Sequence, residues 1–62
     1  MKPRLKVGGQ DGNIFAVLSS ATKVLKQAGL QHQVQEMQER VFNSGSYNEA
    51  LAIISDYVDW EL

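Results

Sequence analysis

The chain has 62 residues, no cysteine, one histidine and a formal net charge of −1. This length allows one domain with a single small core, and the lack of cysteine excludes disulfide bonds. A lone histidine without cysteine does not make a zinc site, and the near-neutral charge differs from the strongly basic balance of many nucleic-acid-binding domains. We therefore expect one domain over 1–62, without a metal or cofactor.

Residues 1–12 are predicted to form an extended arm and a turn. Pro3 favours an extended start, and Leu5-Lys6-Val7 alternates apolar and basic residues as a short strand does. Because one strand cannot satisfy its own backbone groups, this segment pairs with another element, pairs with a second chain, or stays a solvated arm. The glycine-rich stretch 8–13 then predicts a turn.

The first helix is predicted over 13–28, with Asn13 as its N-cap. Gly29 follows as the C′ glycine, and Leu30 is placed for the apolar contact that accompanies such a cap. Phe15 widens the apolar stripe. The stripe itself recurs at three- and four-residue steps, and its members are Ile14, Val17, Leu18, Ala21, Val24, Leu25 and Ala28.

The second helix is predicted over 31–43 and is the most polar of the three. Val34, Met37 and Val41 form its narrow apolar stripe, and Phe42 lies at the edge of that stripe. We expect Gly45 to terminate this helix.

The third helix is predicted over 46–60. Its start, Ser46-Tyr47-Asn48-Glu49, has the pattern of a capping box, in which Ser46 caps the Glu49 N–H and the Glu49 carboxylate binds the Ser46 N–H. The residues expected to face inward are Ala50, Leu51, Ile54, Tyr57 and Val58. The three segments together predict a mainly α, compact three-helix domain with a short N-terminal extended segment or strand.

The charges are unevenly divided along the chain. Residues 1–31 carry five basic side chains and one acid, whereas residues 32–62 carry six acids and one arginine. Two interpretations remain open. The halves either complement each other within the domain, or they form a surface that binds a second copy or a charged partner.

Three short motifs resemble a group of small uncharacterised bacterial and phage proteins. They are Asp11-Gly12-Asn13, then Phe15 within an apolar helix, then Ser44-Gly45-Ser46-Tyr47 followed by Leu51. Ser46 stands where that group usually has aspartate, and Asn48-Glu49 replaces the aspartate and histidine that tend to follow the tyrosine. The resemblance implies the fold and a bacterial or mobile-element origin, and it implies no activity.

Candidate chemistry is sparse. His32 is predicted to be a solvated surface residue rather than a metal ligand. Asp11 and Asn13 are better explained as turn and cap residues than as cation ligands, and the glycines of 8–12 match no phosphate-binding motif. The hydroxyls of Ser19, Ser20 and Thr22 have no base placed by spacing. We therefore expect no catalytic residue and no enzyme activity.

We instead predict a small regulatory or protein-binding module whose partner is an unidentified protein or a second copy. Its candidate surface residues are Phe42, Ile53, Tyr57 and Trp60, although a small core could absorb them. The alternative is a nucleic-acid accessory protein that binds through a basic arm and the first helix, with Lys2, Arg4, Lys6, Lys23 and Lys26. Apolar runs of five residues are too short for a membrane span, and no signal-peptide pattern is visible, so we expect a cytoplasmic protein without membrane contact.

Overall fold

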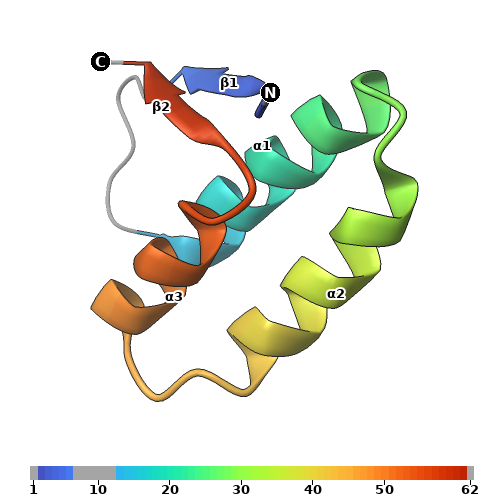
Figure 1. The fold of residues 1–62 in the computed structure, drawn as a ribbon. Coiled ribbons are helices and arrows are strands. Elements are labelled where there is room, and N and C mark those ends of the chain that lie inside the picture. Colours follow the sequence, from blue (N-terminus) through green and yellow to red (C-terminus); the bar gives the residue numbers. More distant parts are fainter. Residues whose placement is uncertain (1, 7–12, 62) are drawn as a thin grey trace.

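The computed structural model describes residues 2–6 and 13–61. Within these ranges the elements are β1 (Arg4–Lys6), α1 (Ile14–Gln27), α2 (Gln31–Phe42), α3 (Tyr47–Ile54) and β2 (Asp59–Glu61), as Figure 1 shows. The predicted class, mainly α with a short N-terminal strand, is confirmed. The turn expected over 8–12 lies outside the described residues.

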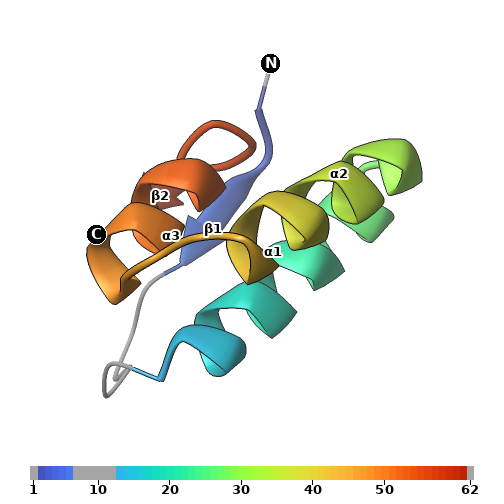
Figure 2. The same cartoon turned by 90° about the horizontal axis from the view of Figure 1, so that it is seen from below.

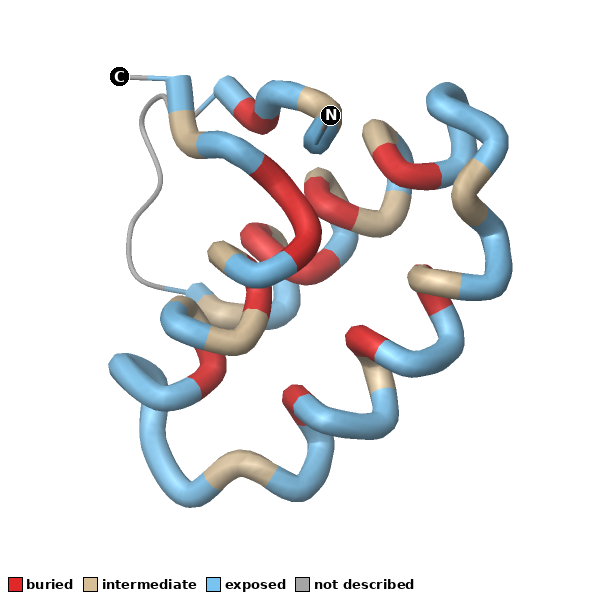
Figure 3. Tube along the Cα trace, viewed as in Figure 1, coloured by how far each residue is buried: buried red, intermediate tan, exposed pale blue. Residues whose placement is uncertain are grey.

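The three helices pack pairwise around one interior. In Figures 1 and 2, α1 and α2 lie side by side in opposite directions, and α3 packs against both of them. The buried positions of each helix face this common interior in Figure 3. The members of this core are Leu5, Val17, Leu18, Ala21, Leu25, Val34, Met37, Val41, Ala50, Ile54, Tyr57 and Val58. The helical spacing of apolar residues therefore identified the buried side of each helix, except that Ala28 and Phe15 of the stripe expected for the first helix are exposed.

Both ends of α1 are capped as the sequence predicts. The Asn13 side chain accepts a hydrogen bond from the Phe15 N–H at 3.0 Å. At the other end Gly29 has a φ of +77°, and the Leu30 N–H bonds the Leu25 carbonyl at 2.9 Å. Together with the bond from the Gly29 N–H to the Lys26 carbonyl, this is a Schellman motif, and it turns the chain sharply into α2.

The connection from α2 to α3 differs in detail from the prediction. Helix α2 ends at Phe42 with Asn43 as its C-cap, so Gly45 does not terminate it as predicted. Gly29 is the only described residue with positive φ. The Ser46 hydroxyl does accept from the Glu49 N–H, at 3.1 Å. The reciprocal bond to the Glu49 carboxylate comes from the Gly45 N–H and not from Ser46. Gly45 thus serves the start of α3 rather than the end of α2.

Helix α3 is shorter than the predicted helix over 46–60, because it ends at Ile54. The chain then forms a turn, in which the Asp56 and Tyr57 N–H groups donate to the carbonyls three residues before them. Strand β2 follows this turn. Strand β2 runs parallel to β1 in a two-stranded sheet. This pairing answers the question left open for Leu5-Lys6-Val7: its described part pairs within the same chain.

The register of the strands pairs opposite charges. Arg4 lies beside Asp59 and Lys6 beside Glu61, and all four are exposed. Leu5 and Trp60 form the pair between them, and both pack on the core. The basic start of the chain is therefore complemented by its own acidic end.

Candidate interaction surface

A hollow of about 340 Å³ opens where three helix ends meet. It lies between the first turn of α1, the last turn of α2 and the start of α3, which gather at one end of the molecule in Figure 1. We call this hollow the aromatic groove. Its described lining consists of Ile14, Phe15, Val41, Phe42, Ser44, Gly45, Ser46, Tyr47 and Ala50.

The groove gathers the exposed large apolar side chains of the described residues. Phe15 is 63% exposed, Phe42 is 64% exposed and Tyr47 is 38% exposed, and all three line the groove. An exposed ring leaves apolar surface in contact with water, and three such rings in one place form a patch of the kind found at binding sites.

The positions of these rings follow from the caps and stripes of the helices. Ile14 and Val41 face the core, so Phe15 and Phe42, each one residue further along, point away from it. The side-chain caps at Asn13 and Ser46 fix the first turns of α1 and α3, which carry Phe15 and Tyr47. The groove is thus built on capped helix ends and on the hydrogen-bonded turn between α2 and α3.

The two serine hydroxyls that line the groove already take part in hydrogen bonds within the domain. The Ser44 hydroxyl donates to the Val41 carbonyl, and the Ser46 hydroxyl holds the Glu49 N–H. None of the described lining residues carries an acid, a histidine or a basic side chain. The aromatic groove therefore offers apolar contact and no acid–base pair for catalysis.

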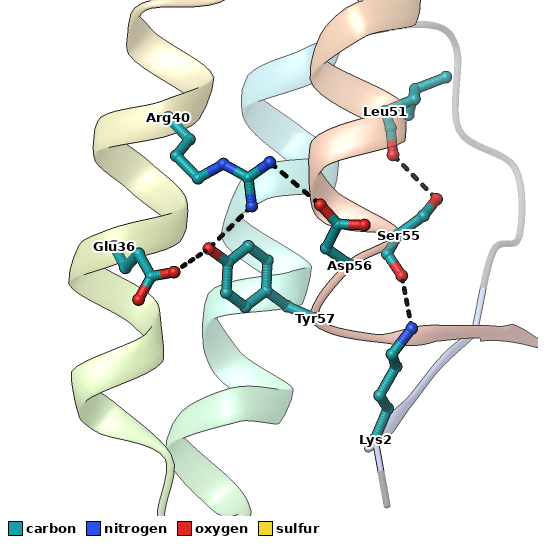
Figure 4. Close-up of polar contacts among 7 residues, drawn as sticks. All are labelled: Lys2, Glu36, Arg40, Leu51, Ser55, Asp56 and Tyr57. Atoms are coloured by element: carbon teal, nitrogen blue, oxygen red, sulfur yellow. Dashed lines mark hydrogen bonds and ion pairs between the residues drawn. The ribbon is translucent and has the colours of Figure 1, made fainter.

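Away from the aromatic groove, a cluster of polar side chains connects α2 to the segment after α3 (Figure 4). The Tyr57 hydroxyl donates to Glu36 at 2.7 Å and accepts from Arg40 at 3.1 Å. Arg40 also forms an ion pair with Asp56 at 3.0 Å, and its guanidinium carbon lies 5.6 Å from the centre of the Tyr57 ring. These contacts hold the segment that follows α3 against α2.

The environment of this cluster shifts two pKa values. Burial raises the pKa of Tyr57; the hydrogen bond from Arg40 opposes this shift, and the bond to Glu36 adds to it. The hydrogen bonds that Arg40 donates to Tyr57 and then to Asp56 raise the pKa of its guanidinium. Both shifts are those expected of a structural contact in which neutral tyrosine meets charged arginine.

The structure separates the four residues predicted for protein binding. Tyr57 is only 6% exposed and belongs to the core, so it is not available to a partner. Ile53 and Trp60 are half-buried against the core, and the Trp60 indole N–H donates to the Ser55 hydroxyl at 2.6 Å. Only Phe42 is freely exposed, and it lines the aromatic groove, which none of the other three residues reaches.

The sequence reasoning did not select Phe15 and Tyr47. A signal for them was present, since Phe15 stands beside the apolar stripe and Tyr47 follows the cap residue directly. Each residue lies in the first turn of a helix, α1 or α3, where fewer neighbours are available to cover its ring.

The basic residues of the nucleic-acid alternative differ in their surroundings. Arg4 and Lys6 have Asp59 and Glu61 beside them, and the Lys2 ammonium donates to the Ser55 carbonyl at 3.1 Å. Lys23 and Lys26 are exposed on the second half of α1. The acids of β2 reduce the positive field that a phosphate backbone would meet at β1.

Two further features concern only the described residues. His32 is exposed in the first turn of α2, and no group of three or more histidine, aspartate or glutamate side chains is placed to hold a metal ion. None of the described helices has the length and apolar character needed to cross a membrane.

Comparison with known proteins supplies no relative. No protein-family model, no curated protein and no solved structure matches this chain.

Proposed function

We propose that the protein is a small, non-enzymatic module that binds another protein chain through the aromatic groove. The observation that carries this proposal is the meeting of Phe15, Phe42 and Tyr47 in one hollow. Folding gains nothing from the parts of these three aromatic side chains that stay in water, because apolar surface stabilises the domain only where it is buried. A partner that covers them gains that stabilisation on binding.

The character of the groove supports a binding role over a catalytic one. The described lining is uncharged, and its two serine hydroxyls serve as local helix contacts. A catalytic site would need a titratable group whose pKa is tuned by its surroundings. The shifted groups in the described residues, Tyr57 and Arg40, belong to the contact between α2 and the segment that follows α3.

A site-specific photo-crosslink tests the proposal. Benzoylphenylalanine replaces Phe42 in the protein expressed in its source cells, and the matched control carries the same residue in place of Gln35, an exposed position of α2 outside the groove. We expect a discrete adduct with a second protein from position 42 only. Equal adducts from both positions, or none from position 42, would contradict a binding role for the groove.

A further inference from the structure

A second copy of this chain has no separate apolar surface on its described helices that could fill the aromatic groove. The exposed large apolar side chains of the described residues are Phe15, Phe42 and Tyr47, and all three already line it. The described helices offer no other exposed apolar pair that another copy's groove could take. A dimer would therefore have to join groove to groove.

The exposed rings are too small for such a dimer. Taking roughly 200 Å² for each aromatic residue, the exposed fractions of Phe15, Phe42 and Tyr47 leave about 330 Å² of this surface per copy. A stable interface between two folded proteins buries about 800 Å² on each side. The three rings alone thus supply less than half of the surface that a dimer of two folded copies would bury, which favours a short segment of a different chain as the occupant.

The volume of the groove sets the number of side chains that can enter. A cavity of about 150 Å³ accepts one benzene molecule. A hollow of about 340 Å³ thus has room for about two leucine-sized or ring-sized side chains. Because the described lining is uncharged, those side chains must be apolar to replace the water without a desolvation cost.

The backbone of the groove favours a helical ligand over an extended one. An extended peptide gains affinity by adding to a sheet edge, but the groove is lined by helix ends and a turn. Within that turn the Ser44 N–H bonds the Val41 carbonyl and the Gly45 N–H bonds Glu49. A helix satisfies its own backbone groups and needs no such partner.

We propose that the aromatic groove receives an amphipathic helix of a partner protein through two large apolar side chains one helical turn apart. Side chains at i and i+3 or i+4 lie about 5–6 Å apart on one helix face, so both can enter one hollow. Phe15 and Phe42 then pack on the two inserted side chains. This inference rests on the proposed function and adds the class of ligand.

Two displayed peptide libraries test the inference, each of about 15 residues with the same composition. One places randomised apolar residues at helical spacing in an alanine-rich frame, and the other places them at every second residue. Peptides that bind the wild-type domain are selected from each library. Their affinities are then measured for the wild type, for Phe15→Ser, for Phe42→Ser and for the control Gln35→Ala. The two phenylalanines are mostly exposed, so their replacement leaves the fold intact, which circular dichroism checks.

We expect binders from the helical library whose affinity falls at least tenfold with Phe15→Ser or Phe42→Ser and stays unchanged with Gln35→Ala. A proline placed between the two anchor residues should abolish binding. Groove-dependent binders from the alternating library that tolerate the proline would overturn the helical ligand and leave the proposed function standing. Binders from either library that ignore both substitutions would overturn the groove itself. A concentration-dependent dimer that Phe42→Ser dissociates would show that a second copy is the occupant.

Discussion

Arg40 on α2 holds two consecutive residues that follow α3, because its guanidinium donates to the Tyr57 hydroxyl and pairs with Asp56. The two contacts differ in setting. The Tyr57 ring is in the core, whereas the side chains of the ion pair are 44% and 58% exposed. The tyrosine contact should therefore matter more for stability than the ion pair does.

Replacing the buried tyrosine tests this difference. Tyr57→Phe removes the hydroxyl that Glu36 and Arg40 share and keeps the ring, so we expect a loss of about 1 kcal/mol in the free energy of unfolding. Asp56→Asn breaks only the exposed ion pair and should change stability much less. Urea denaturation compares the two variants. A larger loss for Asp56→Asn would reverse the ranking.

The same hydroxyl should make stability depend on alkaline pH. Burial raises the pKa of Tyr57 in the folded protein above the value of about 10 for an unfolded tyrosine. The neutral ring therefore stabilises the fold fully below pH of about 10, and this contribution is lost as the pH rises through the higher folded value. Unfolding free energies measured between pH 8 and 11 should fall more steeply for the wild type than for Tyr57→Phe. Parallel curves would rule out this source of pH dependence.

The two turn glycines should respond differently to alanine. Gly29 has a φ of +77°, which an alanine adopts only with strain, so Gly29→Ala should destabilise the protein by about 1 kcal/mol. Gly45 lacks a positive φ, and an added Cβ would meet Glu49 Oε1 at 3.6 Å, an ordinary contact. Gly45→Ala should therefore be close to neutral. Thermal melting of both variants checks the contrast, which fails if the two losses are equal.

The start of α3 should depend on the side-chain cap. Ser46→Ala leaves the Glu49 N–H without its partner and should cost about 1 kcal/mol. Ser46→Asp keeps a cap acceptor and should retain most of the stability. Chemical denaturation of both variants measures this, and equal losses would show that the Ser46 cap contributes little.

Strand β1 should be an integral part of the fold. Leu5 is buried against the helices, so Leu5→Ala should cost about 2–4 kcal/mol, a large loss for so small a domain. The neighbouring exposed Lys6→Ala is the control and should have little effect. If Leu5→Ala melts like the wild type, the N-terminal segment is a free arm.

The helices were predictable because their signals are local. Asn13, Gly29 and Ser46 mark helix boundaries through contacts within five residues along the chain, and the apolar spacing between them marks the buried face. The buried side of each helix can therefore be predicted without knowing which helix packs against it.

The C-terminal strand was missed because its partner is distant in sequence. Tyr57 and Val58 continue the three- and four-residue spacing of α3, so spacing alone extends that helix. A competing signal was present, since Val58 and Trp60 alternate with acids that match the basic residues of β1. The aromatic groove could not be predicted from the sequence either, because it depends on which helix ends meet in the folded chain.

The pairing of Arg4 with Asp59 has a consequence for synthesis of the protein. These residues are 55 positions apart, and ribosomes add about 5–20 residues per second, so β1 waits roughly 3–11 s before β2 exists. Throughout that interval the apolar Leu5 lacks its cross-strand neighbour Trp60. The sheet therefore cannot form until the chain has been made through all three helices and into β2, so its stabilising contacts come only at the end of synthesis.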